Sequence, residues 1–455
     1  MTEVEAGARP DPLAARALAL RVLQRVEREG AHSDAALAAA LAASPLTGLD
    51  RAFATRLVYG TLAWQARLDW HLAGLAARDP SRLDPPVRLI LRLGLYQLLL
   101  LDRVPPHAAV ATSVDLAKRL RPRAAGLVNA VLRRAARAAR ALPLPDPHDD
   151  PVRHLAVSLS HPEWLVARWR TRFGDRELQA LLAADNDEAP TVLRARLGDR
   201  DTLVARLAQA GINARPCRFA PEAVAVGGGD PHALPGYAAG LFSVQSEASQ
   251  LVARLLAPQP GMRVLDACAA PGGKATYLAE LIRGSGLVVA LDRRARGAAA
   301  VAAAARRLDL HRLLVAVVDA RAAGDVLCGT GFDRILIDAP CSGLGTLRSH
   351  PELRWRHLPA DLARLALLQR QILDGILPLL RPGGALVYAT CTITEEENEE
   401  LVGAWLADHP RLERESAAAH LPAAAASLVD AEGALRTLPH RDGLDGFYAV
   451  RIRRR

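Results

Sequence analysis

Two cysteines in this sequence each follow a short apolar run that has the composition of a buried strand. Cys341 lies in Asp-Ala-Pro-Cys-Ser-Gly at residues 338–343, and Cys391 lies in Ala-Thr-Cys-Thr at residues 389–392. A lone cysteine inside an apolar strand is usually a small core residue. A cysteine just past a strand lies instead at the edge where α/β proteins bind ligands, and a nearby positive charge there makes its thiolate available for attack. The pattern favours an α/β enzyme that makes a covalent bond to its substrate.

A third strand-to-loop junction lies upstream, at residues 266–274, and reads Asp-Ala-Cys-Ala-Ala-Pro-Gly-Gly-Lys. Glycines allow a backbone to approach a ligand closely, and a helix that begins there offers free N–H groups. A P-loop is excluded because Cys268 replaces its first glycine and Ala275 replaces its Ser or Thr. A glycine turn alone is a weak signal. The candidate cofactor loop consists of Cys268, Ala269, Ala270, Pro271, Gly272, Gly273 and Lys274.

Four predicted strands each end in an aspartate, and these are Asp266, Asp292, Asp319 and Asp338. An acid at the end of the second strand is well placed to accept hydrogen bonds from ribose hydroxyls, which is the role expected for Asp292. The alternative for Asp292 is a helix cap, because Asp is a preferred capping residue. Acids at four strand ends suit a cofactor that carries a nucleoside and a cationic centre.

The composition of the chain limits its compartment and its partners. The chain has 455 residues, a formal net charge of +9 and five cysteines. The positive charge favours an anionic partner, most simply nucleic acid, with an acidic membrane surface as the alternative. The best apolar stretch, residues 89–101, is too short for a bilayer and contains Arg92, and residues 1–12 do not form a signal peptide. We therefore expect a cytoplasmic protein with no disulfide framework, no membrane span and no metal, and assign no role to Cys217 or Cys328.

The first part of the chain, residues 12–142, has a helical hydrophobic pattern with no competing strand pattern. Its last stretch, residues 118–140, holds eight Lys and Arg side chains and no acid. Arg133, Arg137 and Arg140 share one face of the predicted helix. That face is either a solvated surface, which is the common outcome for a run of charge, or a surface that contacts phosphates.

The remainder of the chain begins with a Pro/Asp-rich linker at residues 143–151 and a small α+β insert. From residue 262 onward strands alternate with helices, which implies a mostly parallel sheet with helices on both faces. The predicted domains are therefore 1–142, all-α; 143–240, linker helices and insert; and 241–455, Rossmann-like α/β. The predicted strands are 191–195, 223–226, 263–266, 287–292, 314–319, 333–338 and 385–389, with 446–453 as a last antiparallel edge strand. The predicted helices after the linker are 161–173, 178–184, 203–210, 274–283, 296–308, 361–377 and 395–407.

The motifs at residues 266–274, 338–343 and 390–392 resemble those of the RNA cytosine-5 methyltransferases of the NSUN/Sun type. His-Pro-Glu at 350–352 and Arg-Trp at 354–355 also match that family. Residues 53–60 and 127–133 resemble the NusB-like RNA-binding domain. With Val-Gln at 244–245 and Ala-Ser at 248–249, the chain is similar to the bacterial 16S ribosomal RNA branch of the family over nearly its whole length. Two departures are Ser246, where the family usually has Asp, and Arg293-Arg294 after Asp292.

The resemblance implies a class I methyltransferase domain that uses S-adenosyl-L-methionine and methylates carbon 5 of a cytosine in 16S ribosomal RNA, cytosine 967 in this branch. It assigns the attack on carbon 6 to Cys391 and the release step to Cys341. Asp338 would contact the edge of the cytosine and border the cofactor. The cofactor would lie over residues 268–274, with Asp292 on its ribose and Asp319 near its adenine. The RNA would be naked or in an early small-subunit particle, the target base would be unstacked, and the protein is expected to be a monomer.

Other functions compete with this interpretation. A tRNA or DNA cytosine-5 methyltransferase is the first alternative, and the DNA enzymes use a Pro-Cys thiol as nucleophile, which would promote Cys341. The Thr-Cys thiol and the NusB-like region speak against a DNA enzyme. The second alternative is a non-catalytic RNA-binding or antitermination-type factor, against which the intact Cys341, Cys391 and Asp338 argue.

Overall fold

The computed structural model describes residues 11–138, 141–227 and 230–455. Its contacts divide the chain into a helical unit, residues 1–187 with 347–356, and a sheet unit, residues 188–346 with 357–455. The helical N-terminal part, the small antiparallel insert and the mostly parallel C-terminal sheet confirm the predicted fold class. The domain boundaries at residues 142 and 240 stay a prediction.

The helical unit has a core of Leu, Val and Ala side chains, as the scarcity of aromatic residues requires. Most of one helix, α5, is buried, which is why this stretch of the sequence is the most apolar. The element at 163–184 is broken at Gly174, whose φ of 72° is incompatible with a continuous helix, so the two helices predicted there are confirmed. The helices are α1 (Ala14–Glu29), α2 (Ser33–Ala42), α3 (Gly48–Ala63), α4 (Gln65–Ala76), α5 (Pro85–Leu100), α6 (Pro106–Leu120), α7 (Ala125–Ala138), α8 (Pro151–Ser158) and α9 (Glu163–Ala184).

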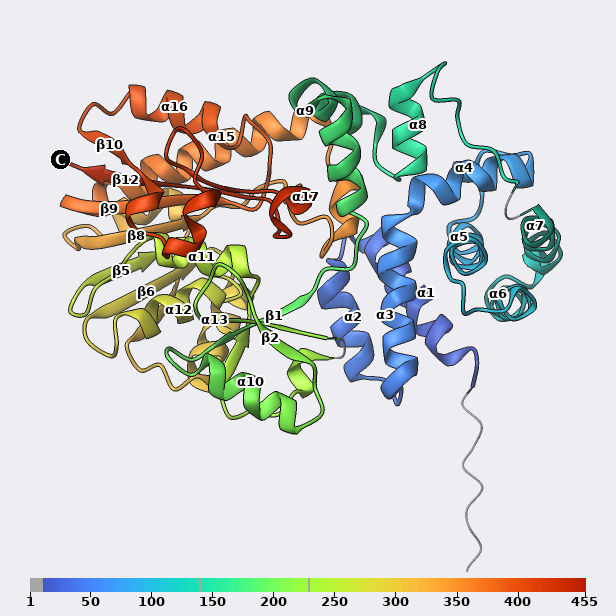
Figure 1. Ribbon diagram of the computed structural model, residues 1–455, viewed down its shortest axis with the longest axis horizontal. Helices are drawn as coiled ribbons and strands as arrows, with labels where there is room; N and C mark the ends of the chain where they lie inside the picture. The colour runs from blue at the N-terminus through green and yellow to red at the C-terminus, as the bar shows by residue number, and fades with distance from the viewer. Residues whose placement is uncertain (1–10, 139–140, 228–229) are drawn as a thin grey trace, which may run out of the picture. The chain divides into compact units, whose positions relative to one another are not determined.

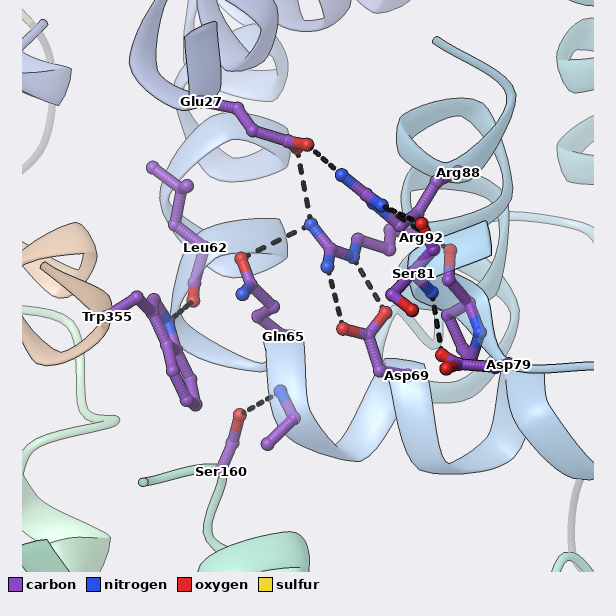
Figure 2. A network of polar contacts seen from close by, with 12 residues as sticks. Glu27, Leu62, Gln65, Asp69, Asp79, Ser81, Arg88, Arg92, Ser160 and Trp355 are labelled. Atoms are coloured by element: carbon purple, nitrogen blue, oxygen red, sulfur yellow. Dashed lines mark hydrogen bonds and ion pairs between the residues drawn. The ribbon is translucent and has the colours of Figure 1, made fainter. Parts of the chain in front are cut away.

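Arg92, the charge inside apolar α5, joins three helices through its guanidinium (Figure 2). It donates to both carboxylate oxygens of Asp69 on α4, at 2.7 and 2.6 Å, and to Gln65 at 3.3 Å. Glu27 of α1 accepts from Arg92 at 3.4 Å and also from Arg88. An arginine that is 7% exposed is therefore fully paired, as a buried charge must be.

The segment 347–356 follows the Cys341 loop in the chain but belongs to the helical unit. Arg354, which is fully buried, donates to the backbone carbonyls of Ser160 at 2.9 Å and Asp185 at 3.1 Å. Trp355 donates its indole N–H to Leu62 O at 3.0 Å, near the end of α3 (Figure 2). These bonds satisfy carbonyl groups at or just beyond helix ends, which have no intrahelical partner.

The insert of the sheet unit is a four-stranded antiparallel sheet in the order β2-β3-β1-β4, with α10 packed on it. Both strands predicted here, β1 and β3, are confirmed, whereas β2 and β4 were not predicted because they have only three residues each. The elements are β1 (Thr191–Ala195), α10 (Arg200–Gln209), β2 (Ala214–Pro216), β3 (Ala223–Val226) and β4 (Phe242–Val244).

The large sheet has the order β10-β12-β9-β8-β5-β6-β7, with β11 paired to β12. Strands β9, β8, β5, β6 and β7 are parallel, and the order reverses between β5 and β8. In such sheets ligands bind beyond the carboxyl ends of the strands at the reversal. The strands are β5 (Arg263–Asp266), β6 (Leu287–Asp292), β7 (Leu313–Val317), β8 (Phe332–Asp338), β9 (Leu380–Thr390), β10 (Leu412–Glu415), β11 (Leu435–Thr437) and β12 (Phe447–Arg454).

Helices cover both faces of this sheet (Figure 1). Alternate strand residues explain the two layers, because Val264 packs into one core and its neighbour Leu265 into the other. One layer holds α11 (Glu247–Leu255), α12 (Gly273–Leu281) and α13 (Ala295–Arg307), and the other holds α15 (Pro359–Ile376) and α16 (Glu399–Ala407). Two further short helices are α14 (Ala323–Val326) and α17 (Pro439–Asp442).

Several details differ from the predictions for the large sheet. Strands β10 and β11 were not predicted, and β9 begins at Leu380 rather than at residue 385. The last strand, β12, is antiparallel to β9 as predicted. It is not the edge strand, because β10 pairs with its other side. Strand β7 ends at Val317, so Asp319 lies two residues beyond it. Helix α16 begins at Glu399 rather than at residue 395, and the residues before it form a loop.

Candidate active site

The two sulfurs singled out in the sequence lie 3.4 Å apart. Cys341 follows β8 and Cys391 follows β9, and these strands are parallel neighbours whose carboxyl ends share one edge. The ladder continues past the strands, because Ala339 donates its N–H to Ala389 O at 2.8 Å. The N–H of Gly345 then donates to Cys391 O at 3.0 Å, so the loop after Cys341 folds back onto Cys391.

The loop after Cys341 is held by a contact between two glycines. Gly446 donates its N–H to Gly345 O at 2.6 Å. A Cβ on Gly345 would lie 2.0 Å from Gly446 O, which is too close for any side chain. Only glycine therefore fits at position 345.

The environment of the two thiols makes them unequal. The hydrogen bond to Cys391 raises the pKa of the Cys341 thiol well above its usual value, and burial and the nearby charges of Cys391 and Glu397 add to this rise. Cys341 therefore keeps its proton when one of the two sulfurs becomes a thiolate.

An ion pair lies across the point where the strand order reverses. Lys274, just inside the start of α12, donates to Asp338 at the end of β8, with 2.7 Å between Nζ and Oδ2. The ammonium also lies 5.4 Å from the centre of the Phe447 ring on β12. The side chain of Lys274 is 11% exposed and that of Asp338 is 28% exposed, so the acid faces the open side of the pair.

The aspartates predicted at the rim are gathered around Cys268. Burial raises the pKa of the Cys268 thiol, and the charges of all four predicted acids add to this rise. Asp266 is fully buried, and neither of its carboxyl oxygens makes a hydrogen bond of ordinary geometry within the described residues. Burial, reinforced by the charge of Asp338, raises the pKa of Asp266 to about 7. The strand ends thus bring four acids close to the loop that carries Cys268.

Asp292 and Asp319 make contacts with residues close to them in the sequence. Asp292 accepts the N–H of Arg294 at 2.7 Å in a local turn and lies over Gly297 in the first turn of α13. The N-cap residue of α13 is Arg294, and no side chain caps this helix, so the capping alternative for Asp292 is not confirmed. Asp319 accepts the N–H of Arg321 at 3.0 Å and pairs with its guanidinium at 2.6 Å. The pKa of Asp319 is lowered mainly by this bond to Arg321.

The glycine turn leads into α12 without a side-chain cap. Gly272 has a φ of 113° and precedes α12, where it provides no capping side chain for the first N–H groups. The nearest atoms to a Cβ placed on Gly273 belong to the side chain of Gln245, 3.7 Å away. Free N–H groups, acids at the strand ends and a buried carboxylate without a good partner fit a nucleoside cofactor with a cationic centre.

Several residues that hold the site were not predicted. Arg194 of β1 is buried and donates to Gly273 O at 2.6 Å and to Gln245 at 2.5 Å, which fixes the glycine turn from the insert. Glu397 accepts hydrogen bonds from the loop after Cys341. Neither could be found from its sequence context, because a lone arginine in a strand and a glutamate in an acidic run both read as solvated.

The departure at Ser246 has no structural cost. Ser246 is the N-cap of α11, and its hydroxyl accepts from the N–H of Ser249 at 3.4 Å. The serine therefore supplies the helix cap expected from an aspartate.

The described ranges hold neither a candidate metal centre nor a candidate membrane span. No group of three or more His, Cys, Asp or Glu residues within them could hold a metal ion. Within the same ranges, no helix combines the length and the apolar character that crossing a membrane requires.

Comparisons with known proteins match each region of the chain. The description "16S rRNA methyltransferase RsmB/F" matches residues 253–453, the NusB family matches 13–137, and an RsmF/B-like ferredoxin-like domain matches 161–230. A Bacillus subtilis protein described as a probable ribosomal RNA small subunit methyltransferase B is 38% identical over 444 residues, 97% of this chain and 98% of its own length. Ribosomal RNA small subunit methyltransferase B of Pseudomonas putida is 39% identical over 89% of this chain and 90% of its own.

Among solved structures, the crystal structure of PH0851 superposes with a TM-score of 0.84 at 25% identity, covering 98% of this chain and all of that one. The order of the matched regions is also the order of the helical part, the insert and the large sheet. The chain therefore belongs to the RsmB/F family of S-adenosylmethionine-dependent 16S rRNA methyltransferases, and it carries the NusB-type helical region and the ferredoxin-like insert of that family.

Proposed function

We propose that this enzyme methylates carbon 5 of one cytosine in 16S ribosomal RNA, cytosine 967 by family resemblance, through a covalent bond between Cys391 and carbon 6. The observation that carries the proposal is the pair of sulfurs 3.4 Å apart, with the Lys274–Asp338 ion pair at the end of β8, the strand that leads to Cys341. S-adenosylmethionine supplies an electrophilic methyl group when bound.

The attack begins with the Cys391 thiolate. Its electron pair forms the bond to carbon 6, and the electrons of the 5,6 double bond move to carbon 5, which becomes nucleophilic enough to take the methyl group. Asp338 accepts from the exocyclic amine at the edge of the base, which orients the ring for attack by the Cys391 sulfur. Lys274 holds Asp338 in place for this contact.

The release step needs a base for the proton on carbon 5, and Cys341 provides it. While Cys391 is a thiolate, its hydrogen bond and its charge keep the proton on Cys341. Once the Cys391 sulfur is bonded to carbon 6 it carries no charge, so the pKa of Cys341 falls and its proton passes to solvent. Cys341 then takes the proton from carbon 5, the double bond reforms, and the electron pair of the carbon–sulfur bond returns to Cys391.

Residues 268–274 would hold the cofactor in this proposal, with Asp292 at its ribose and Asp319 near its adenine. The acids at the strand ends would stabilise the positive charge on the sulfonium of the cofactor. Residues 1–142 and 143–240 form the two RNA-holding domains, and the target base leaves its stack to reach the thiols. The RNA is free or part of an early small-subunit particle.

Transfer of label from S-adenosylmethionine tests the proposal. The wild type, Cys391→Ala and a control, Cys328→Ala, are incubated with a 16S RNA transcript, tRNA or duplex DNA. We expect label in the cytosine-5 position of the 16S transcript with the wild type and with the control, whose changed cysteine is exposed. Cys391→Ala should transfer none. Transfer to tRNA alone, or full activity of Cys391→Ala, would contradict the proposal.

A further inference from the structure

The loops that carry the two cysteines are joined beneath the sulfurs by a buried carboxylate. Glu397 is fully buried and accepts four hydrogen bonds. Oε2 accepts the backbone N–H of Ser342 and the side-chain amide of Gln369, each at 2.9 Å. Oε1 accepts the hydroxyls of Ser342 at 2.5 Å and of Thr394 at 2.8 Å.

The partners of Glu397 come from both sides of the sulfur pair. Ser342 directly follows Cys341, whereas Thr394 lies three residues after Cys391. The hydroxyls of Ser342 and Thr392 are also 2.8 Å apart, so the residues that directly follow the two cysteines contact each other. The carboxylate therefore ties the Cys341 loop to the Cys391 loop.

A second set of bonds fixes the carboxylate itself. Gln369 of α15 donates to Pro340 O at 3.0 Å as well as to Glu397, and the hydroxyl of Tyr388 on β9 lies 2.7 Å from Glu397 O. The next residue, Asn398, accepts from Thr390 at 2.6 Å and donates to Thr392 O at 3.0 Å. Helix, strand and both loops thus converge on one acid that is too deep to touch a substrate.

We propose that Glu397 is a positioning residue that sets the spacing of the Cys341 and Cys391 sulfurs. This inference rests on the proposed roles of the two thiols. The negative charge of Glu397 also faces Cys341 and favours its protonated form, in agreement with a thiol that acts second. A catalytic group needs only small displacements to lose its productive geometry, so loss of the carboxylate should lower kcat more than it raises KM.

The proximity of the sulfurs can be measured without catalysis. Diamide oxidises two adjacent thiols to a disulfide, and its N=N bond takes the two electrons and two protons that the thiols lose. Mass spectrometry of the linked peptides gives the rate of Cys341–Cys391 disulfide formation in the full chain. The variants are Glu397→Ala, Glu397→Gln and the control Glu400→Ala, an exposed acid in the first turn of α16.

We expect Glu397→Ala to form the disulfide about tenfold more slowly than the wild type, because the sulfurs are no longer held together. Its kcat should fall about 100-fold or more while its KM for RNA changes by less than about threefold. Glu397→Gln can keep its oxygen toward the two N–H donors and turn its amide toward the two hydroxyls. We therefore expect it to form the disulfide within about threefold of the wild-type rate.

Wild-type disulfide formation in Glu397→Ala would overturn the proposal, and so would a Glu397→Gln variant as slow as Glu397→Ala. If Glu397→Ala does not fold, Ser342→Ala removes one of the four bonds and should slow the disulfide by about threefold, with an unchanged rate counting against the proposal. A wild type that forms the disulfide but never methylates RNA would contradict the proposed function and leave the role of Glu397 standing.

Discussion

At the scale of single residues, the site gives different properties to two identical thiols. Their sulfurs are 3.4 Å apart, so the charge of one decides whether the other ionises. Burial and Glu397 both act against a thiolate on Cys341. Both effects favour the protonated form of Cys341, which is compatible with the proposed attack by the Thr-Cys thiol rather than by the Pro-Cys thiol.

Asp266 gives a prediction for the protein without cofactor. Its pKa is raised to about 7 in the folded state, above that of an unfolded aspartate. The stability that the protonated group confers is complete below about pH 4 and is lost as the pH rises toward 7. Asp266→Asn removes the titration, so the variant should be more stable than the wild type at pH 8, by up to roughly 4 kcal/mol, and similar to it at pH 4.

Urea unfolding at both pH values measures this difference, with the exposed Asp325→Asn as the control. Equal stability of Asp266→Asn and the wild type at pH 8 would show that Asp266 is not buried as a charge in the folded state.

At the scale of elements, the close contact of the Cys341 loop with the chain before β12 leads to a prediction. A Cβ at position 345 would displace Gly446, and such overpacking costs about 1–3 kcal/mol. Gly345→Ala should therefore lower the free energy of unfolding by that amount and reduce methyl transfer at least about tenfold, because the loop carries Cys341.

The control is Gly403→Ala in α16, where a Cβ meets no atom within 4 Å. This change should be neutral or stabilising, by up to about 1 kcal/mol, because alanine favours a helix. Full activity and wild-type stability of Gly345→Ala would contradict the account of the loop.

Glu352 makes the stability of the helical unit depend on pH in the acid range, because its carboxylate binds the start of one helix. Its carboxylate accepts from the N–H of Ser33 at 3.1 Å and from its hydroxyl at 2.6 Å, at the start of α2. Burial opposes ionisation, but bonds from His32 and Ser33 outweigh it and lower the pKa of Glu352 to about 2. The stability it confers is complete above about pH 4.5 and is lost as the pH falls toward 2, up to roughly 3 kcal/mol.

Urea midpoints between pH 3 and pH 6 test this prediction. The wild type should lose stability over this range, and Glu352→Gln should be less stable at pH 6 and depend less on pH. A pH dependence that is the same in both proteins would remove Glu352 as its cause.

The sequence predicted the elements that are buried and regular. Strands β5 and β6 have the predicted bounds because strands covered on both faces read as apolar runs. The predicted start of α16 was wrong. Acidic residues favour the first turn of a helix, so the sequence predicts a start at residue 395, whereas the side chain of Glu397 turns inward and binds Ser342. The cysteines, the glycine turn and the acids could be predicted from their places at strand ends. Arg194 and Glu397 could not, because their partners are distant in the sequence.

At the scale of the whole molecule, the chain passes from the sheet unit into the helical unit for ten residues, 347–356, and then returns. These residues directly follow the loop that bears Cys341, and they bring Glu352 and Arg354 into the helical unit. Folding of the helical unit therefore depends on a piece of the chain that only the C-terminal half supplies.

The basic face of the helical unit leads to a prediction on RNA binding. Arg133 and Arg137 are exposed on α7, while Arg140 lies outside the described residues. If this face contacts phosphates, Arg133→Ala/Arg137→Ala should weaken binding of the 16S transcript and reduce the slope of log K against log salt by about one to two.

A matched double variant, Arg283→Ala/Arg411→Ala, removes two exposed charges from the sheet unit and should change the slope less. An unchanged slope in the Arg133→Ala/Arg137→Ala variant would show that this face does not contact the RNA phosphates.

The division of labour between the two thiols is tested most directly by trapping the enzyme on its RNA. Cys341→Ala, Cys391→Ala and Cys328→Ala are each incubated with S-adenosylmethionine and the 16S transcript and then run on a denaturing gel. The account predicts a protein–RNA adduct that resists denaturant for Cys341→Ala, since attack proceeds and release does not, and none for Cys391→Ala. An adduct with Cys391→Ala and none with Cys341→Ala would contradict it.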